Sequence, residues 1–502
     1  MNAFPTTAIG SLSSEVVSFL RRLFPLLPAE SEPHAVGGFL RDALLDRSSH
    51  DLDLTVSGDA LAVARHVADA LGGAFVPLDE LRGIARVVVQ DGDETWGVDL
   101  AALQGDQLQD LARRDFTIDA MSVPFHMLLT GDWQTGIMDP FGGMKDLDDH
   151  VVKAVSPEVF REDGLRLLRA VRLAASLDFE IEAGTQDIIR RDAVALEGVS
   201  GERIRDEILA ILATSGAVRH VYLLDDLKLL CQVLPELERS RGVTQPKEHN
   251  WDVFQHSVET VGAVEELLAR TWEPSWELDE VFWNGDLENY FQEVVGEGHT
   301  RATFLKLAGL LHDIGKPAMR SVDPEGRIRF LGHHTEGAIM AHDILQRLRL
   351  GRRSSRMIEV EIDHHLRPGQ MSHGDELATP RAVYRYFRSA GDVAVDTLYL
   401  NLADYLAARG PLLEQEEWVA YAGKVRHILE TGLTQEQTEP EPPLIDGNDL
   451  MANLHLNPGP LVGRLLEAIR EARATGEVTD SDAALALARD VRAADQGKES
   501  HA

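Results

Sequence analysis

The sequence predicts a multidomain α+β protein, in which a mixed sheet-and-helix segment is followed by helical segments. The chain has 502 residues, and because domains usually contain about 100–200 residues, several domains are expected. The β-rich runs that stand out lie before about residue 150. From about residue 155, leucines and isoleucines recur every three or four residues, a spacing that is typical of helices. Hydrophobic residues make up 44% and charged residues 26%, which excludes a wholly disordered, collagen-like or coiled-coil chain.

Charge and cysteine content exclude several classes of protein. The 83 acidic residues outnumber the 49 basic ones, giving a net charge of −34, so any nucleic-acid site must be local rather than spread over the surface. The single cysteine, Cys231, excludes an intrachain disulfide framework and a cysteine-based zinc cluster. We recognise no signal peptide and no stretch long enough to span a bilayer, so we expect a cytoplasmic protein without a membrane partner.

The first segment, residues 1–150, is expected to contain the sheet. Leu52–Val56 has the composition of a short strand, and residues 85–90 and 96–100 form two further β-rich runs. Residues 61–71 have helical periodicity and end at two glycines, which suit a helix C-terminus.

The remaining chain divides by composition into helical segments. Residues 151–245 and 246–433 are both helical in pattern, and the second is rich in histidine. Within it, residues 271–300 carry eight acidic residues, no Lys or Arg, and the aromatic side chains of Trp272, Trp276 and Trp283. We expect a surface insertion there that is partly anchored by its aromatic side chains. Residues 434–443, rich in Thr, Gln, Glu and Pro, are interpreted as a linker to a C-terminal helical unit and tail, residues 444–502.

The first candidate site combines two glycines with two aspartates. Gly37 and Gly38 allow the backbone to pass close to a phosphate, and Arg41 adds a charged donor. Asp51 and Asp53 are two residues apart on the expected strand, so both carboxylates point to the same face. Such a pair can hold the Mg²⁺ ions that phosphoryl or nucleotidyl transfer requires. Alone, an Asp-x-Asp pair also fits a turn followed by a solvated strand.

Further motifs carry a family resemblance. Residues 113–118, Arg-Arg-Asp-Phe-Thr-Ile, and the turn 139–147, beginning Asp-Pro-Phe-Gly-Gly, follow the site described above. Together these motifs resemble the head of class II tRNA nucleotidyltransferases and bacterial poly(A) polymerases. The resemblance implies a polymerase-β-like nucleotidyltransferase head with Mg²⁺, in which Asp51 and Asp53 are catalytic metal ligands. It also implies nucleotide contacts from the following residues: Gly37, Gly38, Arg41, Arg114 and Asp115.

One position departs from the family pattern, which usually has Asn where this chain has Asp119. The change adds a negative charge near the nucleotide. We expect Arg113 or Arg114 to compensate it.

The segment 151–245 begins with a helix that resembles the family's nucleotide-reading helix. Arg166, Arg169 and Arg172 recur every three residues and cover one helical face, which by itself could be a solvated basic surface. The resemblance implies that Asp163 and Arg166 offer a Watson–Crick-like edge to CTP or ATP. Arg169 and Arg172 would then contact the triphosphate or stiffen the helix. A second motif, Gly201–Glu207, is expected to support this helix by ion pairs within a neck and RNA-binding domain.

The segment 246–433 contains a second candidate site. His256, His312-Asp313 and Asp404 follow the order of the HD phosphohydrolase superfamily, which they resemble. The resemblance implies that these four side chains bind a divalent metal, Ni²⁺, Mn²⁺ or Co²⁺, or else Mg²⁺. Histidines in pairs at 333–334 and 364–365 could bind a second metal or a scissile phosphate. Capping and core histidines are the structural alternative for a lone histidine.

Three functions are compatible with these motifs. The leading one is a tRNA nucleotidyltransferase that uses CTP, and also ATP if it completes CCA, with an HD-domain phosphatase or 2′,3′-cyclic phosphodiesterase activity. A poly(A) polymerase is less favoured because the chain lacks a lysine-rich C-terminal extension. A phosphohydrolase with an inert RNA-binding head is less favoured because Asp51, Asp53 and Arg114 are intact.

The segment 101–112 bears on which bases are added. It is short and lacks the basic residues of the flexible loop that helps CCA-adding relatives switch from CTP to ATP. In this it resembles CC-adding enzymes, which leave the terminal A to a separate A-adding enzyme; full CCA addition is the open alternative. Local arginine clusters could contact tRNA or be solvated surface: Arg190, Arg191, Arg347, Arg349, Arg352, Arg353 and Arg356.

Overall fold

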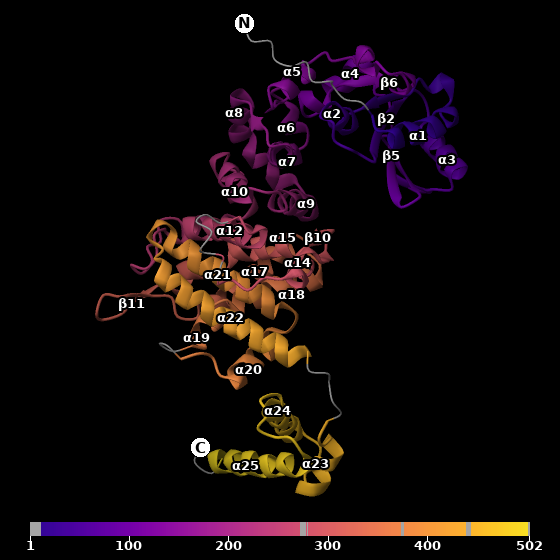
Figure 1. Cartoon of the computed structure of the whole chain (residues 1–502). Coiled ribbons are helices and arrows are strands. Elements are labelled where there is room, and N and C mark those ends of the chain that lie inside the picture. The colour runs from indigo at the N-terminus through magenta and orange to yellow at the C-terminus, as the bar shows by residue number, and fades with distance from the viewer. Residues whose placement is uncertain (1–11, 272–277, 279, 373–375, 438–442, 500–502) are drawn as a thin grey trace. The chain divides into compact units, whose positions relative to one another are not determined.

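The structure is a computed structural model that describes all residues except 1–11, 272–277, 279, 373–375, 438–442 and 500–502 (Figure 1). It divides into two compact units. The first comprises Met1–Ile211 with Leu223–Val233, and the second comprises Leu212–Tyr222 with Leu234–Ala502. No helix among the described residues is long and apolar enough to cross a membrane.

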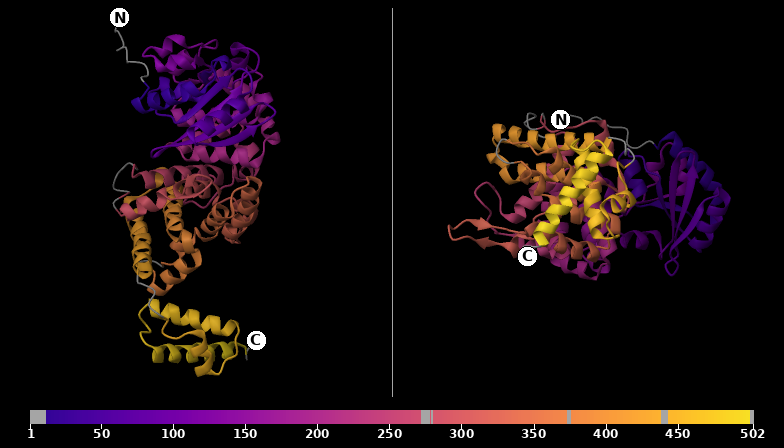
Figure 2. Two further views of the ribbon diagram at one scale, coloured as in Figure 1. Left: turned by 90° about the vertical axis from the view of Figure 1, so that its right-hand side faces the viewer. Right: turned by 90° about the horizontal axis from the view of Figure 1, so that it is seen from below.

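The N-terminal unit is built on a six-stranded mixed sheet with the order β3-β4-β5-β2-β1-β6 (Figure 2). β2 and β5 are parallel, and the other neighbouring strands are antiparallel. The strands are β1 His34–Val36, β2 Asp51–Val56, β3 Ala74–Asp79, β4 Ile84–Asp91, β5 Glu94–Ala102 and β6 Ser122–Pro124. The mixed sheet and its strands β2, β4 and β5 are thus confirmed, whereas β1, β3 and β6 were not predicted.

Local sequence explains the elements that flank the sheet. Helix α3, Ala60–Leu71, begins where the Asp59 side chain accepts a hydrogen bond from the amide of Ala62. It ends at Gly72, whose φ of 66° favours glycine, as predicted. Helix α1, Ser14–Leu23, covers the sheet with Phe19, whose ring stacks on Trp96 at a centroid distance of 4.0 Å.

Short helices complete the unit around the sheet and the neck. Helix α7, Leu165–Leu177, carries Arg166 of the predicted reader pair, whereas Asp163 lies just before it, and the apolar face of α7 is buried. The others are α2 Gly38–Leu44, α4 Gln107–Ala112, α5 Gly143–Asp148, α6 Val159–Glu162, α8 Ala183–Asp192, α9 Gly201–Leu212 and α11 Leu230–Val233; α10 Ala217–Asp226 begins in the second unit and ends in the first. A two-stranded parallel sheet, β7 Val151–Val152 with β8 Glu180–Ile181, lies among them.

The second unit is mostly helical, as predicted. Helix α12, Val253–Ala269, packs against α15, Arg301–Leu311, and against α21, Ala394–Arg409. Around this core lie α14 Gly285–Gln292, α16 Lys316–Met319, α17 His333–Arg347, α18 Arg352–His364, α19 Arg367–Gln370, α20 Pro380–Ala390 and α22 Gln415–Gln437. Two hairpins interrupt the helices: β9 Val294–Gly296 with β10 His299–Thr300, and β11 Ser321–Val322 with β12 Ile328–Arg329. The expectation of an all-α domain is corrected to this extent.

The structure describes only part of the expected acidic insertion and of the expected linker. Of the acidic insertion, Trp272 and Trp276 lie outside the described residues. Trp283 stacks parallel to Phe291, with ring centroids 5.9 Å apart and an interplanar angle of 1°. The expected linker begins too early, because residues 434–437 continue helix α22; most of the remainder lies outside the described residues.

The C-terminal helices have a small core of their own. They are α23 Gly447–Leu454, α24 Pro460–Ala474 and α25 Ser481–Glu499. Leu450, Leu465 and Ala484 are completely buried among them.

Candidate active sites

The predicted nucleotide-binding residues of the head surround one cavity of about 380 Å³. It lies where the ends of β2 and β5 meet helices α2 and α7. Its lining includes Gly37, Gly38, Arg41, Asp53, Asp99, Arg114, Asp115, Asp119, Arg169 and Arg172. All of these except Asp99 were singled out from the sequence, whereas the predicted site residues Asp51, Asp163 and Arg166 do not line this cavity.

Asp53 and Asp99, on two parallel strands, form the acidic wall of this cavity, whereas the predicted Asp51 is exposed and does not line it. Asp51 and Asp53 lie on β2, and the register places Asp53 directly beside Asp99 of β5. Burial raises the pKa of Asp53 to about 6, although the nearby Arg114 guanidinium lowers it. Asp99 was not singled out from the sequence, and Arg86 binds both of its carboxylate oxygens, at 2.7 and 2.9 Å. The sequence indicated that Asp99 lies on a strand, but it did not show that this strand pairs with β2.

Gly37 brings the backbone against the acidic wall. Its φ is +69°, and a Cβ there would lie 2.8 Å from Nη1 of Arg114 and 3.0 Å from Oδ2 of Asp53. Only glycine combines this backbone conformation with this close approach. The first predicted glycine is therefore required by geometry next to the carboxylate.

The arginines of the cavity are paired with carboxylates of the same chain. Arg41 donates to Asp119 at 2.8 Å and to Asp42 at 2.9 and 3.1 Å. Arg169 donates to Asp115 at 2.7 Å. Asp119 thus forms its ion pair with Arg41, whereas Arg114 reaches only its backbone oxygen, at 3.4 Å. The compensation expected from Arg113 or Arg114 thus comes mainly from Arg41, and the nearby charge of Arg114 adds to it.

The two reader residues line a neighbouring cavity of about 260 Å³, together with Arg82, Gln104 and Arg113. Asp163 is bound by Arg203 at 2.7 Å, and this guanidinium lowers the pKa of Asp163, although partial burial opposes the shift. Arg166 donates to the backbone oxygen of Arg113 at 2.9 Å. The two cavities share the lining residues Ile84 and Ala101, so they adjoin.

The motif on α9 makes two ion pairs with the reader segment. Arg203 binds Asp163, and Glu207 accepts a 2.6 Å hydrogen bond from Arg172. These contacts match the supporting role expected for this motif. In the structure, Asp163 and Arg166 thus each have a partner outside the cavity.

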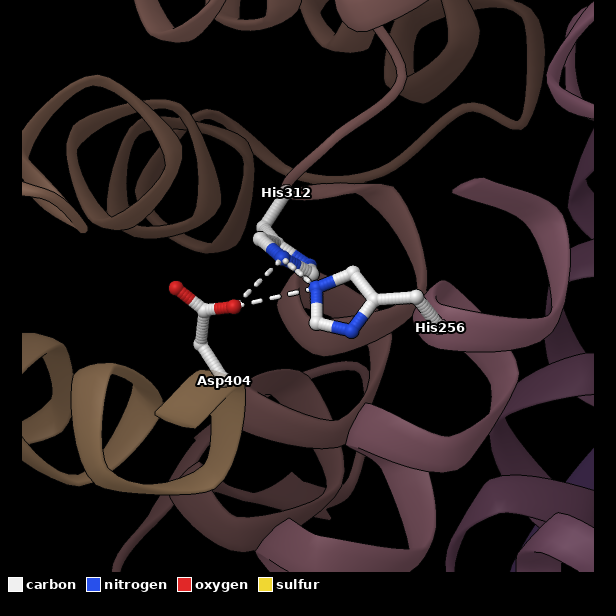
Figure 3. A group of neighbouring side chains, drawn as sticks. All are labelled: His256, His312 and Asp404. Carbon is white, nitrogen blue, oxygen red and sulfur yellow. Dashed lines mark hydrogen bonds and ion pairs between the residues drawn. The ribbon is translucent and has the colours of Figure 1, made fainter. Parts of the chain in front are cut away.

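The four predicted HD residues come together in the second unit, from α12, the end of α15 and α21. His256 Nε2 lies 3.0 Å from Oδ1 of Asp404 and 3.2 Å from His312 Nε2 (Figure 3). Asp313 Oδ2 lies 3.2 Å from Nε2 of both histidines. His256 and His312 are completely buried, and Asp313 is 1% exposed. Imidazole and carboxylate atoms converging in this way fit a divalent metal ion.

The electrostatics of this cluster also favour a cation. Burial alone lowers the pKa of His312, but the carboxylates of Asp313 and Asp404 raise it to about 10. The pKa values of both aspartates are held well below their usual range by the neighbouring histidines, against the effect of burial. Lys316, which sequence reasoning did not single out, places Nζ 2.5 Å from Oδ2 of Asp313.

A cavity of about 450 Å³ opens onto the HD cluster. Asp313, Lys316 and Asp404 line its base, together with His333 and His365. Its walls include Phe330 and the stacked rings of Tyr405 and Tyr421, whose centroids are 3.9 Å apart. The cavity is large enough for a phosphorylated small molecule.

Several arginines considered for tRNA contact are already paired. Arg190 binds Asp187 and Asp226, and Arg191 binds Asp192. Arg347 binds Glu236 at 2.7 Å, and Arg353 lies 3.2 Å from Glu293. The positive charges of these four arginines are therefore already balanced by neighbouring carboxylates.

Family models match three successive parts of the chain. Residues 34–153 match the poly A polymerase head domain, and residues 178–240 match the probable RNA- and SrmB-binding site of polymerase A. Residues 253–409 match the HD domain.

Similar proteins cover nearly the whole chain. It is 35% identical over 464 residues to the A-adding tRNA nucleotidyltransferase of Deinococcus radiodurans, covering 91% of this chain and 95% of that protein. It is 34% identical over 460 residues to the CC-adding tRNA nucleotidyltransferase of Thermus thermophilus, covering 90% and 92%. The fold is similar to the Thermotoga maritima CCA-adding enzyme complexed with tRNA, with a TM-score of 0.60, 21% identity and 96% of each chain covered.

Proposed function

This chain belongs to the class II tRNA nucleotidyltransferase family, and from this premise we propose that it adds two C residues from CTP to the tRNA 3′ end and then stops. Its similarity to A-adding and CC-adding enzymes makes it a tRNA nucleotidyltransferase of the CC-, A- or CCA-adding class. The choice of base is our proposal. We assign transfer to residues 1–150, base reading to 151–245 and hydrolysis to 246–433.

The connection between β5 and α4 carries the proposal. β5 ends at Ala102 and α4 begins at Gln107, so four residues join them. Four residues cannot form a flexible loop over the reader cavity. Asp163 is paired with Arg203 and Arg166 with a backbone oxygen, and within the described residues this connection offers no longer loop that would move them toward a second base. A pocket that reads one base supports an enzyme that adds C alone or A alone, and of these we propose C because segment 101–112 resembles that of CC-adding enzymes.

In the proposed reaction the tRNA 3′-hydroxyl attacks the α-phosphorus of CTP. A new P–O bond forms, the α–β bridging bond breaks, pyrophosphate leaves, and the hydroxyl proton passes to solvent. Asp51 and Asp53 present two carboxylates on one face of β2, which fits Mg²⁺. Bound Mg²⁺ would supply charge neutralisation and a more acidic hydroxyl. The triphosphate would be held by Arg41, Arg114 and the backbone amides of Gly37 and Gly38. Two further cationic contacts would come from Arg172 and from Arg169, which is paired with Asp115.

The test uses three tRNA substrates: one lacking CCA, one lacking CA and one lacking only A. Each is incubated with CTP, ATP or both, and the 3′ ends are sequenced. We expect two C residues on the first, one C on the second and no addition on the third. Adenosine addition only to the third substrate would keep the single-base reader but reverse the base. Addition of all three nucleotides would overturn the single-base reader, and poly(A) tails would favour a poly(A) polymerase.

We further propose that the HD cluster hydrolyses phosphate esters or 2′,3′-cyclic phosphodiesters. The cavity above Asp313 and Asp404, with Lys316 at its base, supports this assignment. The activity should require His312 and Asp313 but not Asp51. Loss of nucleotide addition on replacing Asp313, with intact folding, would contradict this separation of functions.

A further inference from the structure

We propose that Arg86 of β4 binds a backbone phosphate next to the 3′ end of the tRNA, on the side of the head cavity from which the 3′-hydroxyl attacks. The sequence pattern did not single out this arginine. The proposal rests on the proposed triphosphate site of the head. It depends neither on which base is added nor on the HD domain.

The strand register places Arg86 in one row with the aspartates of the acidic wall. Arg86 is directly opposite Asp99 of β5, and Asp99 is directly beside Asp53 of β2. Asp53 is in turn opposite Val36 of β1, the residue before Gly37. Residues that are paired across neighbouring strands point to the same face of a sheet. The row therefore runs across one face of the sheet, from Arg86 at the β4 end to β1.

The geometry of the reaction gives this row a direction. The proposed triphosphate contacts lie at the β1 end, where a Cβ on Gly37 would be 2.8 Å from Nη1 of Arg114. In an in-line transfer, the attacking hydroxyl and the leaving pyrophosphate lie on opposite sides of the α-phosphorus. With the pyrophosphate at the β1 end and the α-phosphorus at the acidic wall, the tRNA 3′-hydroxyl enters from the β4 end. Arg86 lies at that end.

Arg86 is held in place and still has donors to offer. Its Nε and Nη2 donate to the two carboxylate oxygens of Asp99, at 2.7 and 2.9 Å. This bidentate pair fixes the plane of the guanidinium group. Within the residues that the structure describes, Nη1 has no hydrogen-bond partner, and the side chain is 44% exposed. A phosphate can therefore bind the remaining N–H groups while Asp99 keeps its pair.

The charge of the surrounding face favours a phosphate as the ligand of Arg86. Asp51, Asp53 and Asp99 point to the same face of the sheet and would repel an approaching RNA end. Hydrogen bonding to Asp99 raises the pKa of Arg86, partial burial opposes this rise, and the charges of Asp51 and Asp53 add to it. The guanidinium group is thus a permanent cation beside these carboxylates. Guanidinium groups bind phosphate by strong charge-assisted hydrogen bonds.

The β4 end of the row is open to solvent. β3, the next strand, is at the edge of the sheet. Its Val76 lies directly opposite Arg86 and is 41% exposed, and Leu78 on the same strand is 52% exposed. An RNA end can therefore reach Arg86 without displacing an element of the sheet.

The test combines variants of Arg86 with a tRNA that lacks one backbone charge. The full chain is assayed on tRNA lacking CCA, in which one of the linkages nearest the 3′ end is a neutral methylphosphonate. The reference tRNA has the same sugars and an ordinary phosphodiester at that position. Addition of one labelled nucleotide, from CTP or from ATP, gives kcat and the KM values for tRNA and for nucleotide.

We expect the neutral linkage, at one position, to raise the KM for tRNA about tenfold with the unaltered enzyme. Arg86→Ala should raise this KM about tenfold on the reference tRNA, and the neutral linkage should then have no further effect. The KM for nucleotide should change by less than about twofold. Arg86→Lys, which keeps the charge, should lie between the two. The matched control is Arg22→Ala, an arginine of similar exposure that pairs with Asp91 at the far end of β4, and it should behave like the unaltered enzyme.

The outcomes separate a phosphate contact from a merely structural ion pair. An equal effect of the neutral linkage on the unaltered enzyme and on Arg86→Ala would overturn the proposal, because an arginine that only balances Asp99 gives that result. A rise in the KM for nucleotide alone would overturn it by placing Arg86 at the triphosphate. No effect of any neutral linkage on the unaltered enzyme would overturn it without any variant. Incorporation of A in place of C would contradict the proposed base choice, whereas a linkage effect that Arg86→Ala abolishes would still support this proposal.

Discussion

The head cavity and the HD cluster are both organised around aspartates, but different groups face those aspartates. In the head, guanidinium groups pair with them: Arg41 with Asp119, Arg86 with Asp99 and Arg169 with Asp115. In the HD cluster, the buried imidazole rings of His256 and His312 converge on Asp313 and Asp404.

This difference predicts when each site receives its metal. A triphosphate can enter the head only if arginines exchange a carboxylate for a phosphate, so we expect Mg²⁺ there to arrive and leave with the nucleotide. In the HD cluster the ring of His312 is already oriented by the carbonyl of Gly309, 2.8 Å from its Nδ1, so we expect the metal there to be resident. The following predictions break or sharpen this comparison.

The largest effect is expected from Asp53→Asn. An amide cannot replace a carboxylate as a bridging Mg²⁺ ligand, so the rate of CMP addition should fall by about 10³-fold or more. Hydrolysis by the HD domain should be unchanged. The control is Asp59→Asn, which alters only the N-terminal cap of α3. Equal loss of both activities would mean that the two sites are not independent.

Metal removal should affect the two units unequally. A resident ion at about 100 times its dissociation constant stabilises the folded state by about 2.7 kcal/mol. For a domain of this size, calorimetry should therefore show the C-terminal unit melting about 5–10 °C lower after chelation. The N-terminal unit should melt at the same temperature with or without the chelator. A matching shift in both transitions would contradict the distinction between resident and arriving metals.

The pH dependence of stability should identify the buried charge in the head. Burial raises the pKa of Asp53 to about 6 from a normal 3.8, so its ionisation opposes folding. The resulting stability is present below the normal pKa and lost as pH rises through about 6. Asp53→Asn should therefore stabilise the N-terminal unit by about 2–3 kcal/mol at pH 7.5 and hardly at all at pH 3.5. Thermal melts across this range check the prediction; a constant difference would exclude burial of the charge as its cause.

The smallest effect concerns the departure from the family at Asp119. Asp119→Asn removes the carboxylate that competes with phosphate for Arg41, so the KM for CTP should fall about fivefold, with kcat within about twofold. Steady-state kinetics on tRNA lacking CCA measure both constants. Asp59→Asn, which alters only the N-terminal cap of α3, is the control. A fall in kcat without a change in KM would give Asp119 another role.

Sequence reasoning succeeded where the signal is local. The alternation of Leu52 and Leu54 predicts β2, and the glycine after α3 predicts its end. It failed where contacts between distant parts of the chain determine the site. Asp99 lies in the acidic wall only because β5 pairs in parallel with β2. Arg41 binds Asp119, which is 78 positions away in the sequence. β1 and β6 have three residues each, too few for a periodic pattern. The sequence showed the histidines of the HD cluster, but not the backbone carbonyl of Gly309 that orients the ring of His312.

The pairing of these arginines with carboxylates also affects how the affinity of an acidic chain for RNA depends on salt. When a basic side chain with no partner binds RNA, condensed cations are released from the phosphates, and affinity falls steeply as salt rises. Arg190, Arg347 and Arg353 already have carboxylate partners, and each carboxylate freed by RNA would take up a cation from solution. Net ion release is then small. If tRNA binds at these arginines, we therefore expect its affinity to depend only weakly on salt concentration, despite the net charge of −34.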